Sequence, residues 1–392
     1  MKKTLAIITL LVTLISLFGC GKVEIQVPSP FAYPDYTYDN APTAEQMRET
    51  AVRAVRDLLT FQWCTANTIE YTKVIAGKNR SFKHEPGISY GGLPYTQAGS
   101  GLFQFLEYYD SKTGVFSYDG TGEDMKNQLG SACADSLLWS VTTVCNSVTG
   151  GYYPVMMVPA NGYIPVGGYK IKENIKSYHE DPTYAITEDN GLDVIMDAYS
   201  KTLPADLLIS TPEDHAMMVV EKPTVVYLAD GSIDKDNSYL VICDQYTGSE
   251  ADPEDPIVKK GRLDKKFTFG QLFDGDYIPL TTPEFAGTKA YEKATVTTDN
   301  ANCSSFADLH NTTVESNYPL AVINVYSVGS FGKKTLLGRK LFNGRAYEGV
   351  ERSFKLSNIE YPENTTVDNG AKIQVEVVVS TGERFTPIEF KA

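Results

Sequence analysis

Cysteine and histidine are scarce in this chain, and they are not grouped. Six cysteines and four histidines are spread over 392 residues, without a Cys-x-x-Cys pair or a close Cys/His cluster of the kind that holds zinc. One cysteine lies in the N-terminal leader, which leaves an odd number for the folded chain. We therefore expect at least one free thiol, no disulfide framework, no metal and no cofactor.

Basic residues are also few relative to acidic ones. Lys and Arg number 35 against 49 Asp and Glu, which gives a net charge of −14 at pH 7, and the bases are scattered rather than aligned in one stripe. Proteins that bind nucleic acid concentrate positive charge where the phosphates lie. Nucleic acid is therefore not an expected partner.

Long apolar runs are absent except near the N-terminus. Two lysines there precede an apolar stretch over residues 5–18, which is shorter than the ~20 residues that a membrane-spanning helix needs. The Gly19-Cys20 pair that follows resembles the cleavage box of bacterial lipoproteins. We predict that residues 1–20 are a lipoprotein signal and that Cys20 carries the lipid, which implies an exported protein anchored to the membrane at the bacterial cell surface. Ordinary secretion after a nearby cleavage is the alternative.

The chain beyond the signal divides by texture. Residues 21–42 are rich in Pro and Tyr and show no sustained hydrophobic period, as is typical of a tether. Helical and mixed patterns fill residues 43–300, whereas every strong segment in residues 305–392 has the pattern of a strand. Since 42% of all residues are apolar, there is material for two cores, and we predict two domains with these bounds.

Two segments of the first domain have strong helical signatures. Thr43 and Gln46 form a capping box at the start of "TAEQMRETAVRAVRDLLTF", whose apolar residues recur at helical spacing. In "GSACADSLLWSVTTVCNSVTGG" apolar residues again repeat at three and four, and the Gly150-Gly151 pair is a stop signal. We predict one helix over the first segment and another from near Cys133 to Gly150.

Strand patterns begin at about residue 215 with "HAMMVV", "TVVYLADG" and "SYLVICDQY". Beyond residue 305 five more follow, separated by Gly, Asn and Pro turns: "PLAVINVYSV", "TLLGRKLF", "VERSFKLSNI", "KIQVEVVVS" and "RFTPIEF". Short strands at such spacing predict a small β-sandwich of the immunoglobulin-like type. The predicted fold class is α+β, with helices packed on an antiparallel sheet and the sandwich behind them.

Cys133 stands at the start of the second predicted helix. An isolated cysteine is more often a core residue than a nucleophile, because cysteine is among the most buried residue types. Its context here favours a nucleophile, since His215 opens a later strand and the polar Asp244 lies near the end of the next. Cysteine attacks as a thiolate, which the free N–H groups of a helix start and a nearby imidazolium both stabilise.

These segments resemble, in chain order, the motifs of papain-like cysteine peptidases. "NQLGSACADSLLWSV" is similar to the nucleophile region, "DHAMMVV" to the histidine strand, and "YLVICDQY" to the strand that in this family ends in asparagine, a small residue and tryptophan. The leading helix with "FQWCTA" and the "YGGLPY" element resemble bacterial cell-wall endopeptidases of the NlpC type. The resemblance covers roughly residues 43–290 and implies a papain-like domain.

The resemblance assigns a role to each matched residue. It implies Cys133 as the nucleophile and His215 as general base and then general acid through an acyl-enzyme. Asp244 would orient the imidazole, and Gln245 is the alternative if the strand register differs. The side-chain amide of Gln128 and the backbone N–H of Cys133 would form the oxyanion hole.

The sequence departs from the family pattern at several of these positions. Ala134 stands where the family has tryptophan, Asp244 replaces asparagine, and Tyr246 replaces the later tryptophan. Gln128 lies one residue closer to the cysteine than in papain, and acidic Asp135 follows the nucleophile. An acidic residue at this place favours the helix start but opposes a neighbouring thiolate.

The resemblance implies a surface-anchored cysteine hydrolase that cleaves peptide amide bonds, with cell-wall stem peptides as the expected substrate class. Two alternatives remain open at this point: a non-catalytic surface binding protein with a degenerate peptidase fold, and an amide or acyl transferase that uses the same nucleophile. The other histidines, His84, His179 and His310, have polar surroundings and are predicted to lie on the surface.

Overall fold

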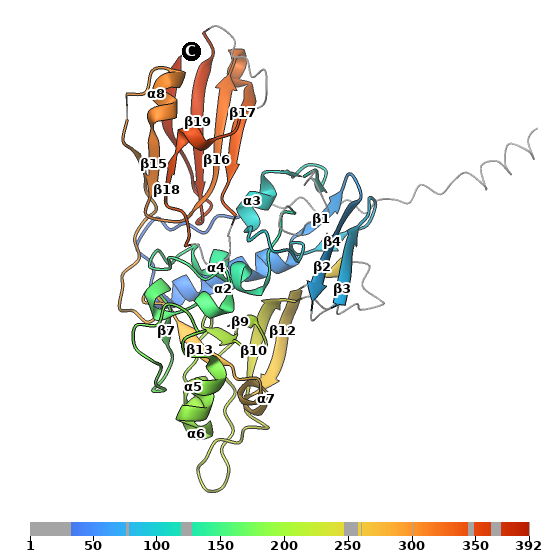
Figure 1. Cartoon of the computed structure of the whole chain (residues 1–392), viewed down its shortest axis with the longest axis vertical. Helices are drawn as coiled ribbons and strands as arrows, with labels where there is room; N and C mark the ends of the chain where they lie inside the picture. Colours follow the sequence, from blue (N-terminus) through green and yellow to red (C-terminus); the bar gives the residue numbers. More distant parts are fainter. Residues whose placement is uncertain are drawn as a thin grey trace, which may run out of the picture.

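The computed structural model describes residues 33–75, 78–118, 128–246, 258–259, 261–300, 302–343, 349–361 and 370–391. The predicted signal, Cys20 and most of the predicted tether lie outside these ranges. Within them, none of the helices combines the length and the apolar character that crossing a bilayer requires. Helices and several sheets occur together, which confirms the α+β class (Figure 1).

The first part of the chain combines helices with a six-stranded antiparallel sheet. Its helices are α2 (Ala44–Thr60), α3 (Leu102–Leu106), α4 (Cys133–Val141), α5 (Thr183–Asn190), α6 (Leu192–Ser200) and α7 (Phe269–Asp274), with 3-10 turns at Pro154–Met156 and Pro159–Asn161. The sheet has the order β12-β10-β9-β8-β13-β7. In that order its strands are Gly261–Thr268, Tyr239–Gln245, His215–Val219, Leu207–Ser210, Ile278–Thr281 and Ile164–Pro165.

A smaller mixed sheet lies beside this unit, with the order β11-β4-β1-β6-β5. In that order its strands are Val258–Lys259, Tyr90–Gly91, Gln62–Thr65, Val115–Phe116 and Tyr109–Asp110. A separate hairpin projects from it and consists of β2 (Ile69–Ile75) and β3 (Lys78–His84). This edge of the molecule is on the right in Figure 1.

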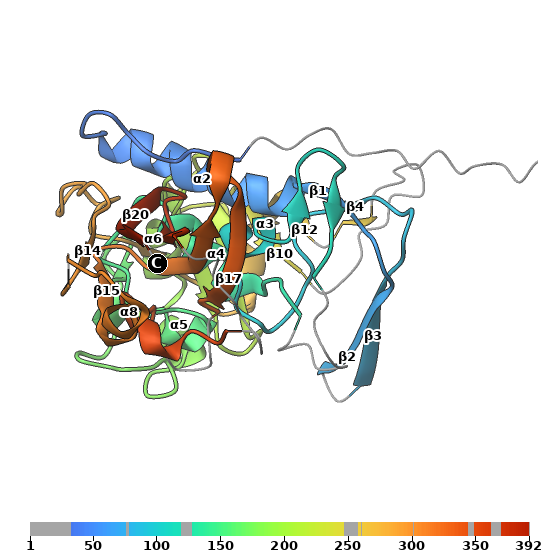
Figure 2. The same cartoon turned by 90° about the horizontal axis from the view of Figure 1, so that it is seen from above.

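Helix α2 forms as its sequence predicts. The Thr43 side chain accepts from the Gln46 backbone N–H at 3.2 Å, and the Gln46 side chain accepts from the Thr43 N–H at 2.8 Å. The apolar face, including Met47, Val55 and Leu58, is buried in the main core. Figure 2 shows this long helix running along one side of the molecule.

Helix α4 lies at the centre of the fold, in contact with α2 and with strands β9 and β10. All of its nine residues are buried. It ends at Val141, so the prediction of a helix as far as Gly150 is wrong. The run Val141 to Val144 is β-branched throughout, which disfavours further helix, and turns continue the chain while keeping the same apolar side chains buried.

The predicted elements around the six-stranded sheet are present only in part. The predicted strands at residues 215 and 239 are confirmed as β9 and β10. The "TVVYLADG" segment makes only isolated bridges, Thr224 with Tyr239 and Tyr227 with Ile233, and the Tyr227 side chain is 63% exposed. Helices α5 and α6 were not predicted. Helix α5 has almost no amphipathic signal and buries only three of its residues, whereas α6 has a buried apolar face that the sequence analysis missed.

Two antiparallel sheets make up the C-terminal part. One has the order β14-β15-β18, with strands Val296–Thr298, Thr313–Ser316 and Ser353–Lys355. The other has the order β17-β16-β19-β20, with strands Lys334–Leu341, Leu320–Val328, Lys372–Val379 and Arg384–Lys391. Helix α8 (Phe306–Asn311) and 3-10 turns at Ser330–Gly332 and Leu356–Asn358 complete it. Four of the five predicted strands are confirmed as β16, β17, β19 and β20; in the fifth segment, 350–359, only Ser353–Lys355 is a strand and Leu356–Asn358 is a 3-10 turn. Residues from both sheets share a second core.

The C-terminal sheets also satisfy the backbone that follows α4. The last carbonyls of a helix and the turns after it need donors when they are buried. Here Ser380 donates to Thr142 O at 2.7 Å, and Tyr318 donates to Val144 O at 3.2 Å. Arg352 donates to the carbonyls of Asn146, Val148 and Asn317, at 2.7, 2.8 and 2.6 Å. In Figure 1 the C-terminal strands stand above α4 accordingly.

We predict that Arg352→Ala lowers the free energy of unfolding by about 3 kcal/mol, because it removes the donor for three carbonyls in a partly buried interface. Urea denaturation would measure this loss. Lys372→Ala is the matched control: its ion pair with Glu389 is about half exposed on both sides, so the loss there should stay below about 1 kcal/mol. Equal losses in the two variants would contradict the account of the interface.

Candidate active site

Cys133 is the first residue of α4, and a tight turn presents it. Gly130 precedes it with φ +155°, and a Cβ at Gly130 would lie 2.3 Å from the Pro94 carbonyl oxygen, so only glycine permits this close approach. The Asp135 carboxylate accepts from the Ala132 N–H at 2.5 Å and so caps the helix start. That contact gives Asp135, the acidic residue near Cys133, a structural role in ordering the first turn.

His215 lies opposite this helix start, at the beginning of β9. It pairs with Ser210 across the β8–β9 hairpin. The preceding Asp214 has a left-handed backbone, φ +45°, which turns the hairpin back toward α4. The Asp214 carbonyl oxygen accepts from the Cys133 thiol at 3.8 Å, so the sulfur rests against the residue next to the histidine.

The His215 ring is held by Asp244, which lies on the neighbouring strand β10. The ring Nε2 and an Asp244 carboxylate oxygen are hydrogen-bonded, and the Asp244 side chain is fully buried. Burial alone would lower the pKa of His215, but the Cys133 sulfur and the Asp244 carboxylate outweigh it and raise that pKa to about 10. The imidazolium form is therefore favoured at neutral pH, beside the thiol.

Asp244 itself is kept ionised by two partners. Burial would raise its pKa, but hydrogen bonds from Arg262 and His215 lower it below the usual range. Gln245 points elsewhere, since its amide donates to the Leu93 carbonyl at 2.7 Å. The structure thus brings Asp244, and not the alternative Gln245, to the His215 ring.

Tyr246 packs against the same ring, at the position that the resemblance matches to a tryptophan. Its ring lies edge-on to the His215 ring, with centroids 6.3 Å apart. The Arg262 guanidinium lies over the Tyr246 ring, 4.1 Å from its centroid. An aromatic side chain thus shields the polar cluster from solvent on this side.

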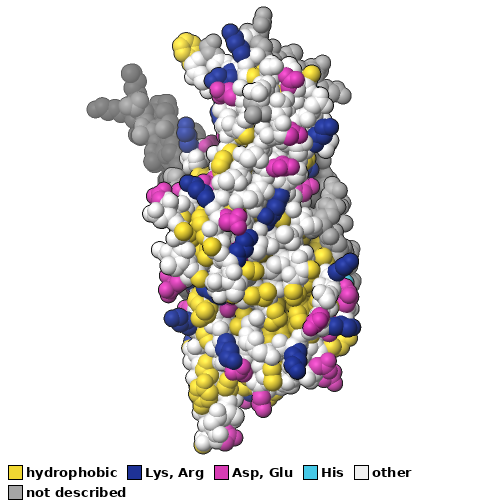
Figure 3. Space-filling view, turned by 90° about the vertical axis from the view of Figure 1, so that its left-hand side faces the viewer, with side chains coloured by type: hydrophobic (Ala, Val, Ile, Leu, Met, Phe, Trp, Pro, Cys, Tyr) yellow, Lys and Arg dark blue, Asp and Glu magenta, His cyan; other side chains and the backbone are white. Residues whose placement is uncertain are grey.

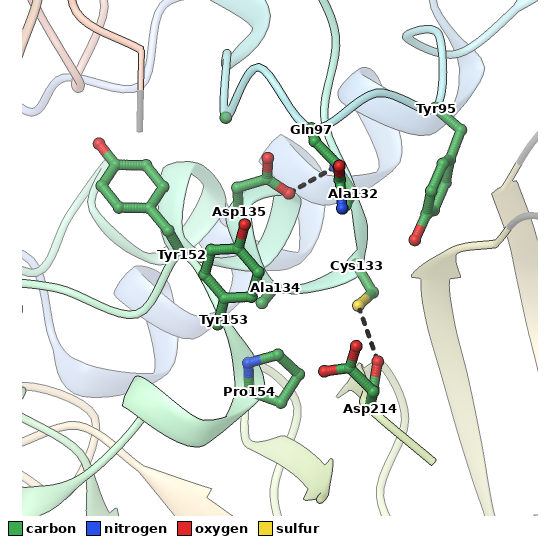
Figure 4. A pocket seen from close by; sticks show the side chains of 11 residues that line it. Tyr95, Gln97, Ala132, Cys133, Ala134, Asp135, Tyr152, Tyr153, Pro154 and Asp214 are labelled. Atoms are coloured by element: carbon green, nitrogen blue, oxygen red, sulfur yellow. Dashed lines mark hydrogen bonds between the residues drawn. The ribbon is translucent and has the colours of Figure 1, made fainter. Parts of the chain in front are cut away.

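The hollow in front of Cys133 is bounded mostly by tyrosines and the helix start (Figure 4). Among the described residues, those that line it are Cys133, Tyr95, Gln97, Gly99, Ala132, Ala134, Asp135, Tyr152, Tyr153, Pro154 and Asp214. Figure 4 shows Tyr152, Tyr153 and Pro154 on one side of the sulfur, Tyr95 on the other, and Gln97 beside Ala132. Besides the tyrosines, the polar side chains that line the hollow with the sulfur are Gln97, Asp135 and Asp214.

Gln128 does not belong to that lining. It is buried, at 5% exposure, and precedes the turn that leads to Cys133. Gln97 lies there instead, because the segment before α3 runs alongside the helix start: Thr96 N–H donates to Ser131 O, and Ser131 N–H donates to Pro94 O, both at 3.1 Å. Sequence reasoning did not select Gln97, since the link between these segments is long-range.

Comparison with models of known protein families, with curated proteins and with solved structures gave no match to this chain.

The remaining histidines divide into two kinds. His179 and His310 are exposed. His84 is buried, with 5% exposure, and its ring packs on Trp63 and Tyr90, so its predicted surface position is wrong. The prediction failed because the aromatic partners of His84 come from other strands, Trp63 from β1 and Tyr90 from β4.

We predict that Cys133 reacts with iodoacetamide much faster than the other cysteines of the folded, reduced protein. Thiolate fraction and access determine the rate, and among the described cysteines Cys133 alone lies at a helix start beside the His215 ring. Burial raises the pKa of the others, which are Cys64, Cys145, Cys243 and Cys303. Mass spectrometry of the alkylated peptides gives the order of reaction, and His215→Ala should slow Cys133. If Cys133 is labelled only after denaturation, it is a core residue.

Proposed function

We propose that this protein is a papain-like cysteine hydrolase that cleaves peptide amide bonds. The observation that carries the proposal is the position of the His215 ring: a buried carboxylate holds its Nε2, and its remaining nitrogen is free to serve the Cys133 sulfur. A nucleophile at a helix start, a base beside it and a buried group behind the base are the parts that nucleophilic catalysis needs.

The reaction follows from these parts. The Cys133 thiolate attacks the carbonyl carbon of the amide, and a carbon–sulfur bond forms as the carbonyl oxygen takes up negative charge. The His215 imidazolium gives its proton to the leaving nitrogen, the carbon–nitrogen bond breaks, and a thioester remains. His215, now neutral, takes a proton from water, whose oxygen displaces the sulfur and releases the carboxylic acid.

Two donors are available for the oxyanion. The first N–H groups of a helix have no partner within the helix, so the Cys133 N–H is one. We assign the second to the Gln97 side-chain amide, in place of Gln128, because Gln97 lines the hollow in front of the sulfur. Donors fixed before the reaction are worth more than donors that must reorganise.

The overall architecture supports the same proposal. Helix α4 carries the nucleophile and packs against β9 and β10, which carry His215 and Asp244, as expected for a papain-like domain. The seven strands of the C-terminal sheets support an immunoglobulin-like accessory unit. With the predicted lipoprotein signal at Cys20, the substrate class we favour is a peptide at the cell surface, such as a cell-wall stem peptide.

Hydrolysis of such peptides is the direct test. The purified protein is incubated with peptidoglycan and with synthetic stem peptides, and new amino and carboxyl termini are identified by mass spectrometry. Cys133→Ser and His215→Ala should reduce turnover by at least about a thousandfold, whereas His179→Ala and His310→Ala, which are exposed, should leave it unchanged. Equal losses in all four variants would refute the site.

The products also separate the alternatives. New termini without an added group indicate hydrolysis, and a product joined to a supplied amine indicates transfer through the same thioester. Tight binding of peptide without any turnover would favour a non-catalytic surface protein.

We predict that Gln97→Leu lowers kcat by about a hundredfold with little change in KM, because it removes a donor to charge that exists only in the transition state. Gln128→Leu is the matched control and should leave kcat within about threefold of the wild type. Steady-state kinetics on one peptide decide between them. The reverse order would restore Gln128 to the oxyanion hole.

We predict that kcat/KM falls on the alkaline side only near pH 10. The His215 pKa is raised to about 10, so the ring keeps the proton for the leaving amine through neutral pH and loses it as the pH rises through that value. A free imidazole would lose it near its ordinary value of about 6.5. A pH–rate profile measures the midpoint, and an alkaline midpoint below about pH 8 would contradict the charged pair.

A further inference from the structure

We propose that Arg262 is a positioning residue for the nucleophile, and that the Asp244–Arg262 pair together takes the place of a neutral hydrogen-bond acceptor behind His215. This inference rests on the proposed function, since it concerns the same site. Asp244 is ionised, whereas a neutral side chain behind His215 would carry no charge. The positive charge of Arg262 cancels the negative charge of Asp244, so the pair together is neutral.

The contact between the two residues is built into the sheet. Strands β10 and β12 pair Ile242 with Lys265, but the next register puts Asp244 opposite Arg262 rather than opposite Leu263. The extra residue on β12 is a bulge, and Asp264 within it has φ +54°. Because directly opposed residues share a face of the sheet, the bulge is what turns Arg262 toward the carboxylate.

Arg262 binds Asp244 through two nitrogens. Its Nε donates to one carboxylate oxygen at 2.9 Å, and its Nη2 donates to the other, which is also the oxygen that His215 binds. The same Nη2 lies 3.3 Å from the His215 Nε2. A guanidinium fork of this kind fixes the plane of a carboxylate, which a single ammonium group cannot do.

The guanidinium is itself held in place. Its carbon lies 4.1 Å from the centroid of the Tyr246 ring and 5.3 Å from that of the Phe267 ring. Only 13% of its side chain is exposed, and none of the Asp244 side chain. The pair is therefore rigid and poorly screened by solvent, so its charges act strongly on the ring beside it.

The formal charges of four side chains determine how each substitution acts on the Cys133 thiolate. A thiolate at Cys133, an imidazolium at His215, the Asp244 carboxylate and the Arg262 guanidinium sum to zero. Without Arg262 the site carries an extra negative charge, which opposes the thiolate. Without the Asp244 charge the site carries an extra positive charge, which favours the thiolate. Removal of both charges restores neutrality.

Other titratable groups surround Cys133, His215, Asp244 and Arg262. Those within electrostatic reach of the four groups are Tyr95, Asp135, Glu213, Asp214, Tyr246 and Tyr277. Burial raises the pKa of Tyr95 and Tyr277, so both stay neutral over the range of the test. The carboxylates are the same in every variant compared below.

The test is the pH dependence of alkylation at Cys133, which needs no substrate. The rate constant with iodoacetamide is measured from about pH 4 to pH 10 for the full protein and for Arg262→Gln, Asp244→Asn and the double variant. Relative to the wild type, the pH of half-maximal rate should rise by about one unit in Arg262→Gln, fall by about one unit in Asp244→Asn, and return in the double variant.

Arg262→Lys and Lys201→Gln complete the set. Lysine keeps the charge but not the fork, so its midpoint should stay near that of the wild type while turnover falls about tenfold. Lys201 pairs with Asp197 on α6 at an exposed site away from the bulge, and Lys201→Gln should change neither quantity. Circular dichroism and thermal melting confirm folding for each variant.

The outcomes distinguish this inference from the proposed function. If wild-type Cys133 shows no enhanced reactivity, the proposed function fails. If it is reactive but both single variants shift the midpoint the same way, or the double variant gives no recovery, Arg262 has only a structural role. If Arg262→Gln does not fold while the double variant does, with a wild-type midpoint, the charge pairing is supported.

Discussion

The buried carboxylate of Asp244 is the constraint on which the rest of the site depends. An unpaired charge in this position would be too costly to retain, so the carboxylate must be met by cations and donors. Arg262 and His215 meet it together, and in doing so they fix the ring that faces Cys133. The same interaction that makes the burial tolerable therefore also orients the base and favours its charged form.

Helix α4 connects the Cys133 site with the C-terminal sheets. Its first turn presents the sulfur and is capped by Asp135, and the turns beyond its end depend on donors from the C-terminal sheets. A second set of contacts joins the same two parts, because Glu107 forms ion pairs with Arg339 and Arg384, at 2.9 and 2.8 Å. The C-terminal sheets thus support α4, the helix that carries Cys133, at the end away from the sulfur. On the face shown in Figure 3, charged side chains of both signs are scattered, and hydrophobic side chains gather in the lower half.

Local signals in the sequence predicted part of this fold and site. The capping box at Thr43, the strands at the C-terminus and the helix start at Cys133 each depend on neighbouring residues, and each is present. The position of Gln97 depends on a parallel bridge between distant loops, and the position of Arg262 depends on a bulge in β12. No local sequence pattern encodes either feature. His84 was misplaced for a similar reason, since its aromatic partners come from other strands. The end of α4 at Val141 was not predicted, because the apolar spacing continues beyond it. The turns that follow are satisfied by hydrogen-bond donors from distant parts of the chain, which the spacing does not reveal.

The central claim is that Cys133 forms a covalent acyl intermediate while His215 and Asp244 are in place. Rapid acid quenching after mixing with a peptide thioester or activated ester, followed by peptide mapping, tests it most directly. The account predicts one acyl group per chain, on Cys133, which accumulates in Asp244→Ala and is released by water in the wild-type protein. Acylation spread over several cysteines, or its absence from Cys133 in the folded protein, would contradict it.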